Sequence, residues 1–181
     1  MATLNISANN SLKYLYERLN TLREKESTKT NFKFEEAELI GRIKTLEAYP
    51  NKPIYFIEDT YSCFDAVTFN DTGNIKALIE IKNRNVASTT YDTAQFEQGK
   101  FNSMLEKQKE LGAEKLIFIA HYTDNKTAVW CLDNYKDKQS VTFSSPYQTA
   151  GNTTKVIKNM VLLPISEANI LLRESTDKSI N

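Results

Sequence analysis

A short apolar run that ends in charged residues constrains this chain more than any other feature. The run spans 75–82 and ends with Glu80 and Lys82. An earlier segment, 63–69, is rich in β-branched and aromatic residues, and a polar turn with Asn, Asp and Gly separates the two. Both segments are therefore predicted to be strands of a hairpin. Because side chains alternate across a strand, Glu80 and Lys82 point the same way, and the hairpin brings Asp65 beside them.

Charged groups at the end of an apolar strand need a physical reason. Ionised side chains are costly to bury unless they are paired or bind a metal. Two carboxylates and an ammonium in this setting predict metal-ion phosphodiester chemistry, and the alternative is a salt bridge between exposed strand residues. No other Glu in the chain has a Lys two residues later. Asp124 and Lys126 have the same spacing, but they lie in a polar turn.

The chain resembles the PD-(D/E)XK nuclease superfamily of restriction-endonuclease-like and Holliday-junction-resolvase-like enzymes. The resemblance rests on Asp65 and on the triplet Glu80-Ile81-Lys82. Phe64 stands where the family name has Pro. The resemblance implies that Asp65 and Glu80 bind Mg²⁺, with Mn²⁺ as a possible substitute. It also implies that the carbonyl of Ile81 completes the coordination, and that Lys82 is catalytic.

The same resemblance implies roles for residues outside the hairpin. Glu36, on the helix before the sheet, is a candidate additional metal ligand, although acidic residues also favour the first turn of any helix. Lys100 is a candidate catalytic residue and Gln98 a candidate nucleic-acid contact, with Gln95 as a competitor for Gln98. Arg84 is a further candidate nucleic-acid contact. For each of these polar helix residues, the alternative is that the side chain is exposed to solvent and has no role in the site.

The periodicity of apolar residues predicts an α/β fold in one domain, 1–181, with a mixed central β-sheet flanked by helices. The resemblance implies an αβββαβ core at about 32–133, preceded by an extra helix and followed by a strand-rich extension at about 134–173. The expected helices are 12–25, with Ser11 as cap, then 33–48, 93–111 and a short 166–173; the expected strands are 54–57, 63–69, 75–82, 115–121, 127–132, 141–143 and 156–164.

The composition limits the classes of protein to which this chain can belong. The chain has 23 basic and 23 acidic residues, so bulk charge does not favour tight non-specific binding to duplex DNA. No apolar run is long enough to span a bilayer and no signal peptide is visible, which predicts a cytoplasmic protein. Cys63 and Cys131 are expected to be buried thiols in a reducing compartment. His121 is the only histidine, and we expect it to be structural.

The sequence therefore predicts a Mg²⁺-dependent endo- or exonuclease, with DNA as the expected substrate and a homodimer as a possible state. Three alternatives stay open. One is a non-catalytic nucleic-acid-binding protein with the same fold, and another is a structural protein, for example of a phage particle. The third is a nuclease that acts on RNA.

Overall fold

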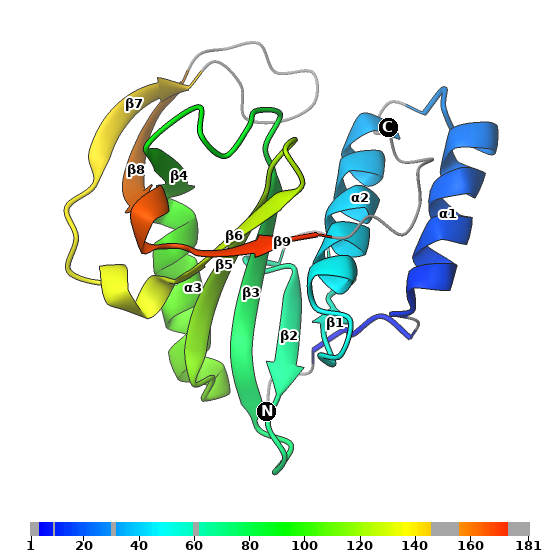
Figure 1. Cartoon of the computed structure of the whole chain (residues 1–181). Helices are drawn as coiled ribbons and strands as arrows, with labels where there is room; N and C mark the ends of the chain where they lie inside the picture. The colour runs from blue at the N-terminus through cyan, green and yellow to red at the C-terminus, as the bar shows by residue number, and fades with distance from the viewer. Residues whose placement is uncertain (1–3, 9, 30–31, 60–61, 146–155, 174–181) are drawn as a thin grey trace.

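The computed structural model describes residues 4–8, 10–29, 32–59, 62–145 and 156–173. A central sheet separates two layers (Figure 1). Helices α1 and α2 cover one face, and helix α3 with a smaller sheet covers the other. The chain is thus an α/β protein, as the sequence predicts. Among the described residues, no helix has both the length and the apolar character needed to cross a membrane.

The central sheet contains six strands in the order β1-β2-β3-β5-β6-β9. The pair β3–β5 is parallel and the other pairs are antiparallel, so the sheet is mixed as expected. Strands β2 and β3 form the predicted hairpin. The strands are β1 Tyr55–Phe56, β2 Ala66–Phe69, β3 Ile75–Asn83, β5 Lys115–His121, β6 Lys126–Cys131 and β9 Asn169–Leu172.

Local sequence signals fix the ends of the helices. Helix α1 (Leu12–Lys25) begins at Ser11, whose hydroxyl accepts a hydrogen bond from the Tyr14 amide at 3.3 Å, as predicted. Helix α2 (Phe32–Ala48) packs against α1, and α3 is shorter (Gln98–Leu111). Gly112 ends α3 with a φ of 65°, a left-handed conformation that suits glycine.

The segment 93–97 was predicted as the start of a helix, and the structure shows a strand. Strand β4 (Thr93–Glu97) pairs with β8 (Val156–Pro164), which also pairs with β7 (Val141–Ser145), so the three form a second sheet. Within β4, Ala94 and Phe96 are buried and Gln95 is exposed. Buried and exposed side chains thus alternate with a period of two residues, which is typical of a strand. Strand β4 continues directly into α3.

The predicted helix at 166–173 is also wrong. The chain there forms a short 3₁₀ turn, η2 (Ile165–Glu167), followed by strand β9. A second 3₁₀ turn, η1 (Leu132–Tyr135), follows β6. The C-terminal extension therefore contributes to both sheets, since β9 pairs with β6 while β7 and β8 hold β4.

Two hydrophobic clusters lie on opposite faces of the central sheet. Leu78, Phe118 and Trp130 belong to the α3 side, while Ile79 and Ile119 belong to the α2 side. Alternation along β3 therefore places Glu80 and Lys82 on the α3 side. The second sheet and α3 together form the layer against which these two side chains lie.

Candidate functional site

The β2–β3 hairpin brings Asp65 beside Glu80. The Asp65 amide donates to the Ile79 carbonyl at 2.8 Å, which continues the ladder of β2. The Ile81 amide donates to Asp65 Oδ2 at 2.7 Å. The hairpin backbone therefore fixes the orientation of the Asp65 carboxylate, and Ile81 takes part through its N–H. The metal-ligand role of the Ile81 carbonyl stays a prediction.

The Glu80 carboxylate is the centre of the site. Its side chain is fully buried, with an exposed fraction of 0%. Lys100 Nζ, from α3, lies 2.5 Å from Glu80 Oε1, and Lys82 Nζ lies 3.2 Å from the same oxygen. Glu80 Oε2 is buried and has no hydrogen-bond partner among the described residues. Leaving such an oxygen without a partner is unfavourable by about 1–3 kcal/mol, and more for a charged group.

The electrostatics of the site favour proton or cation binding at Glu80. Burial, helped by the neighbouring Asp65 carboxylate, raises the pKa of Glu80 from 4.5 to about 7, although Lys82 and Lys100 oppose the shift. Partial burial alone would lower the pKa of Lys82. The carboxylates of Glu80 and Asp65 more than offset this, and the pKa of Lys82 is raised. The positive charges of Lys82 and Lys100 therefore do not fully offset the cost of burying the ionised Glu80 carboxylate.

The structure brings together four of the predicted residues: Asp65, Glu80, Lys82 and Lys100. The predicted nucleic-acid contacts lie at the margin. The Arg84 guanidinium donates to the Gln95 carbonyl at 2.7 Å and lies 5.9 Å from the centre of the Phe118 ring. Gln98 Nε2 donates to Asn102 Oδ1 at 2.8 Å along α3.

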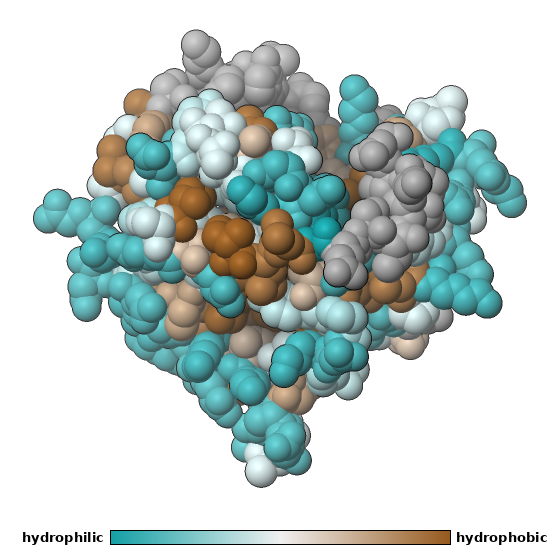
Figure 2. Space-filling model, viewed as in Figure 1, coloured by the Kyte–Doolittle hydropathy of each residue, from teal (hydrophilic) through white to brown (hydrophobic). Residues whose placement is uncertain are grey.

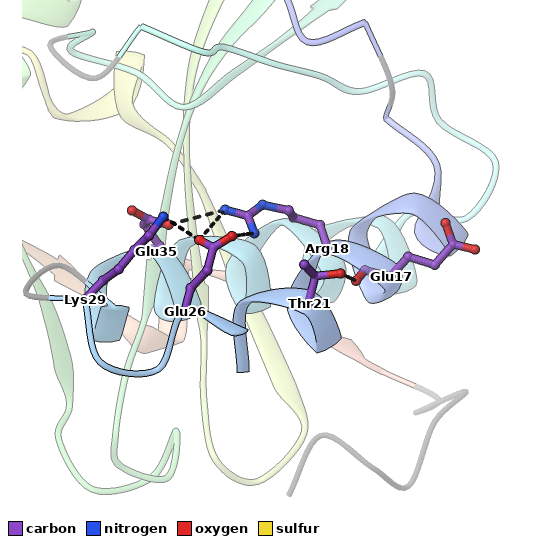
Figure 3. A network of polar contacts seen from close by, with 6 residues as sticks. All are labelled: Glu17, Arg18, Thr21, Glu26, Lys29 and Glu35. Atoms are coloured by element: carbon purple, nitrogen blue, oxygen red, sulfur yellow. Dashed lines mark hydrogen bonds and ion pairs between the residues drawn. The ribbon is translucent and has the colours of Figure 1, made fainter. Parts of the chain in front are cut away.

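Glu36 is not brought to Asp65 and Glu80. Its Oε1 accepts a hydrogen bond from Arg23 Nε of α1 at 2.7 Å, which ties α2 to α1. Its neighbour Glu35 makes the same kind of contact, with Arg18 of α1, within a network of charged residues that joins the two helices (Figure 3). The acidic start of α2 thus faces α1, and this arrangement does not support the predicted role of Glu36 as a metal ligand.

Small residues of α2 face the end of β3 instead. Asn83 Nδ2 donates to the Ala37 carbonyl at 2.6 Å. A Cβ atom at Gly41 would lie 3.1 Å from Asn83 Nδ2 and 3.3 Å from Ile81 Cγ2, so the helix and strand are in close contact there. This contact is on the face of the sheet opposite Glu80, which explains why α2 contributes no carboxylate to the site.

The sequence interpretation missed Cys63 as a neighbour of the site. This free thiol is half-buried, and burial raises its pKa while the charges of Lys100 and Lys107 oppose the shift. Its position two residues before Asp65 was the available signal, although the structure shows bends at Cys63 and Asp65 and begins β2 only at Ala66. Cys131 is also free and half-buried.

His121 is structural, as predicted. Its imidazole is fully buried, with Nε2 2.9 Å from the Thr45 hydroxyl and Nδ1 2.8 Å from the Thr127 hydroxyl. Because the Thr45 hydroxyl donates to the Gly41 carbonyl, it accepts from Nε2–H, and Nδ1 accepts from Thr127. Burial, with Arg173 and Lys44 nearby, lowers the pKa of His121 well below its ordinary value.

The donor set at the hairpin can hold a hard cation. Asp65 and Glu80 supply two carboxylates, and no group of three or more His, Cys, Asp or Glu side chains suited to a metal occurs among the described residues. Mg²⁺ in proteins is often bound by only one or two carboxylates, and it keeps several water molecules. Comparison with protein-family models, curated proteins and solved structures finds no match for this chain.

Proposed function

We propose that this protein is a Mg²⁺-dependent nuclease that hydrolyses phosphodiester bonds, with DNA as its substrate. The observation that carries the proposal is the buried Glu80 carboxylate. One of its oxygens has no partner among the described residues, a second carboxylate lies beside it, and two ammonium groups are within reach of its other oxygen. The second carboxylate, Asp65, adds repulsion beside a buried one, which a salt bridge formed only for stability does not explain.

The order of elements agrees with this proposal. A helix, three antiparallel strands, a helix and a parallel strand follow in the sequence α2-β1-β2-β3-α3-β5, with β4 inserted before α3. This is the order that the PD-(D/E)XK resemblance implies. The proposed catalytic residues lie near the carboxyl end of β3, which pairs in parallel with β5. In α/β sheets, ligands commonly bind at the carboxyl ends of parallel strands.

The proposed metal would be held by Asp65 and by Glu80 Oε2. When bound, a divalent cation polarises a phosphoryl oxygen and lowers the pKa of a water molecule. It also offsets the repulsion between the two carboxylates, which matches the raised pKa of Glu80. Glu80 Oε2 is buried and has no partner in the part of the chain that the structure describes, and such an oxygen is the kind of group that a cation satisfies.

The two lysines have different positions and therefore different proposed roles. The Lys82 side chain is 53% exposed, so its ammonium can reach a phosphate that arrives from solvent. There it would stabilise the charge that develops on the phosphoryl oxygens. The Lys100 side chain is 27% exposed and its ammonium is closer to Glu80. Lys100 would hold Glu80 Oε1, so that Oε2 remains directed to the metal.

The test is an incubation with linear, circular and branched DNA and with RNA, each with Mg²⁺, Mn²⁺ or EDTA. We expect cleavage of DNA that requires the metal. Asp65→Asn should abolish it, whereas Asp71→Asn, an exposed carboxylate in the β2–β3 turn, should have no effect. Equal activity in both variants would refute the proposed site. If the wild type binds nucleic acid but cuts none, the non-catalytic alternative is correct; if it neither binds nor cuts, the structural alternative is favoured.

A further inference from the structure

A pocket lies beside the loop that follows β3 in the sequence. Its volume is about 480 Å³, and its walls include Ser88, Thr89 and Tyr91 of the β3–β4 loop, Lys126 of β6 and Ile170 of β9. Pockets of 300–1,000 Å³ typically hold small molecules or single groups of a larger ligand. None of these residues belongs to the Asp65–Glu80 cluster.

The register of the central sheet gives the straight-line distance between this pocket and the proposed site, through the buried Ala120 and Ala128. Lys82 pairs with Ala120, Ala120 with Ala128, and Ala128 with Ile170, so Lys82 and Ile170 are the ends of one row across four strands. Paired residues share a face of a sheet, and the row therefore lies on the α3 side. Three strand spacings of about 4.8 Å separate Lys82 from Ile170 by about 14 Å.

The loop that lines the pocket is held in place by the β5–β6 turn. The Ser88 hydroxyl and amide donate to Asp124 Oδ2 at 2.7 Å and 3.2 Å, and the Thr123 amide donates to the Val86 carbonyl at 3.1 Å. The Ile165 amide donates to the Asp92 carbonyl at 2.8 Å, which joins the far end of the loop to η2. Tyr91 therefore extends from a loop that is fixed on both sides.

The walls of the pocket combine an aromatic ring, an ammonium group, a hydroxyl group and an apolar side chain, together with one exposed carboxylate, Asp92. Tyr91 is 66% exposed, so the faces of a large aromatic ring are available to a ligand. Lys126 is an ammonium with a contact of only 3.6 Å to Asp124, which leaves it able to pair with an anion. Thr89 adds an exposed hydroxyl, and Ile170 adds an apolar wall that is 39% exposed. A ligand that matches the ring, the hydroxyl and the ammonium has a flat ring, polar edges and a negative charge, which describes a nucleotide.

We propose that this pocket is a subsite for one unpaired nucleotide, whose base stacks on Tyr91 and whose phosphate pairs with Lys126. The inference rests on the proposed nuclease function, because it places the nucleotide on the strand that carries the reacting phosphate at Lys82. A separation of about 14 Å corresponds to roughly four nucleotides of a stacked strand at ~3.4 Å each, and to fewer in an extended strand. A base inside a duplex has both faces covered by its neighbours, so only an unpaired base can use Tyr91 in this way.

A protein partner is the competing occupant. Hydrophobic side chains gather at the centre of the face in Figure 2, where β9 crosses the front of the molecule in Figure 1. Ile170 and Leu172 are 39% and 77% exposed, and β9 is an edge strand. A second copy paired along β9 would use these groups, but it has no need of a lysine and hydroxyls in the adjacent pocket. The polar walls therefore favour the nucleotide.

The test measures binding without cleavage. A fluorescent 12-nucleotide single strand and the matching duplex are titrated with the full-length protein in Ca²⁺, and affinity is followed by anisotropy. Tyr91→Ala should weaken single-strand binding about tenfold and leave duplex binding unchanged, whereas Tyr91→Phe should keep most of the affinity. Tyr14→Ala, at an exposed tyrosine of α1, is the matched control. Lys126→Met should weaken binding and reduce the salt dependence by about one phosphate contact.

The outcomes separate this inference from the nuclease proposal. If Tyr91→Ala binds single strands as tightly as the wild type while Asp65→Asn loses cleavage, the subsite is refuted and the nuclease proposal is supported. If the wild type cuts nothing but loses single-strand binding on Tyr91→Ala, the subsite is supported and the nuclease proposal falls. If Tyr91→Ala has no effect, and light scattering shows a dimer that Leu172→Lys dissociates, the surface belongs to a second copy and the subsite is overturned.

Discussion

Replacing Glu80 by Gln is expected to stabilise the metal-free protein at alkaline pH and to have little effect at acid pH. Burial and the neighbouring Asp65 raise the pKa of Glu80 from 4.5 to about 7. Between these pH values the folded protein keeps a proton that the unfolded chain has lost. The free energy of unfolding therefore falls as the pH rises through this window, and it stays low above pH 7.

The size of the effect follows from the change in pKa. One pKa unit corresponds to 1.36 kcal/mol, so ionisation of Glu80 lowers the stability of the folded state by about 3 kcal/mol at pH 8 and by less than about 1 kcal/mol at pH 5. Gln has nearly the same shape and does not ionise. Glu80→Gln should therefore raise the melting temperature at pH 8 by roughly 6–12 °C.

The assay is thermal unfolding of both proteins at pH 5 and pH 8, in EDTA and in excess Mg²⁺. Glu106→Gln, an exposed carboxylate on α3, is the control and should shift neither curve. Excess Mg²⁺ should raise the melting temperature of the wild type and leave Glu80→Gln unchanged, because the metal stabilises only the protein that binds it. If Glu80→Gln gains no more stability at pH 8 than at pH 5, ionisation of Glu80 does not destabilise the folded protein and the argument is refuted.

Three further predictions concern other parts of the chain. Lys82→Ala should lose most cleavage in a gel assay but keep the Mg²⁺-induced rise in melting temperature, whereas Asp65→Asn should lose both; normal cleavage by Lys82→Ala would refute its role. Because burial, with nearby positive charges, lowers the pKa of His121, the unfolded chain gains a proton as the pH falls below about 6.5. Because Glu80 acts in the opposite direction over this range, calorimetry is done in the Glu80→Gln background, where stability should be about 1 kcal/mol lower at pH 5.5 than at pH 7.5 and His121→Gln should remove that difference. Asp133 accepts hydrogen bonds from a side-chain amide at 2.9 Å and a strand amide at 2.8 Å, so Asp133→Ala should lower stability in urea by about 2–3 kcal/mol. Asp137→Ala should change stability little, and equal losses for the two would contradict this account.

Features set by neighbouring residues could be predicted from the sequence. The hairpin follows from alternation and from a turn that contains Gly73, whose φ is 80°. The ends of α1 and α3 follow from a hydroxyl at Ser11 and a glycine at Gly112. Once the hairpin is predicted, the proximity of Asp65 and Glu80 follows from register alone.

Features set by distant residues could not be predicted. Strands β4 and β9 have only five and four residues, and each is a strand because a partner remote in sequence, β8 or β6, pairs with it. The contact of Glu36 with Arg23 of α1 could not be predicted for a similar reason, and neither could the close approach of Gly41 to β3. Neither contact can be read from the helical repeat of α2.

The pairing of β4 with β8 joins the start of α3 to a strand that is synthesised later. Strand β4 passes without a loop into α3, and Lys158 of β8 pairs with Glu97 at 2.5 Å, next to the first residue of the helix. The segment that secures Lys100 is therefore made after every proposed catalytic side chain. At 5–20 residues per second, the 64 residues from Lys100 to Pro164 (164 − 100 = 64) take a ribosome roughly 3–13 s. During that interval the nascent chain contains both carboxylates and both lysines of the cluster but lacks β8, so α3 can pack only against β3, β4 and β5.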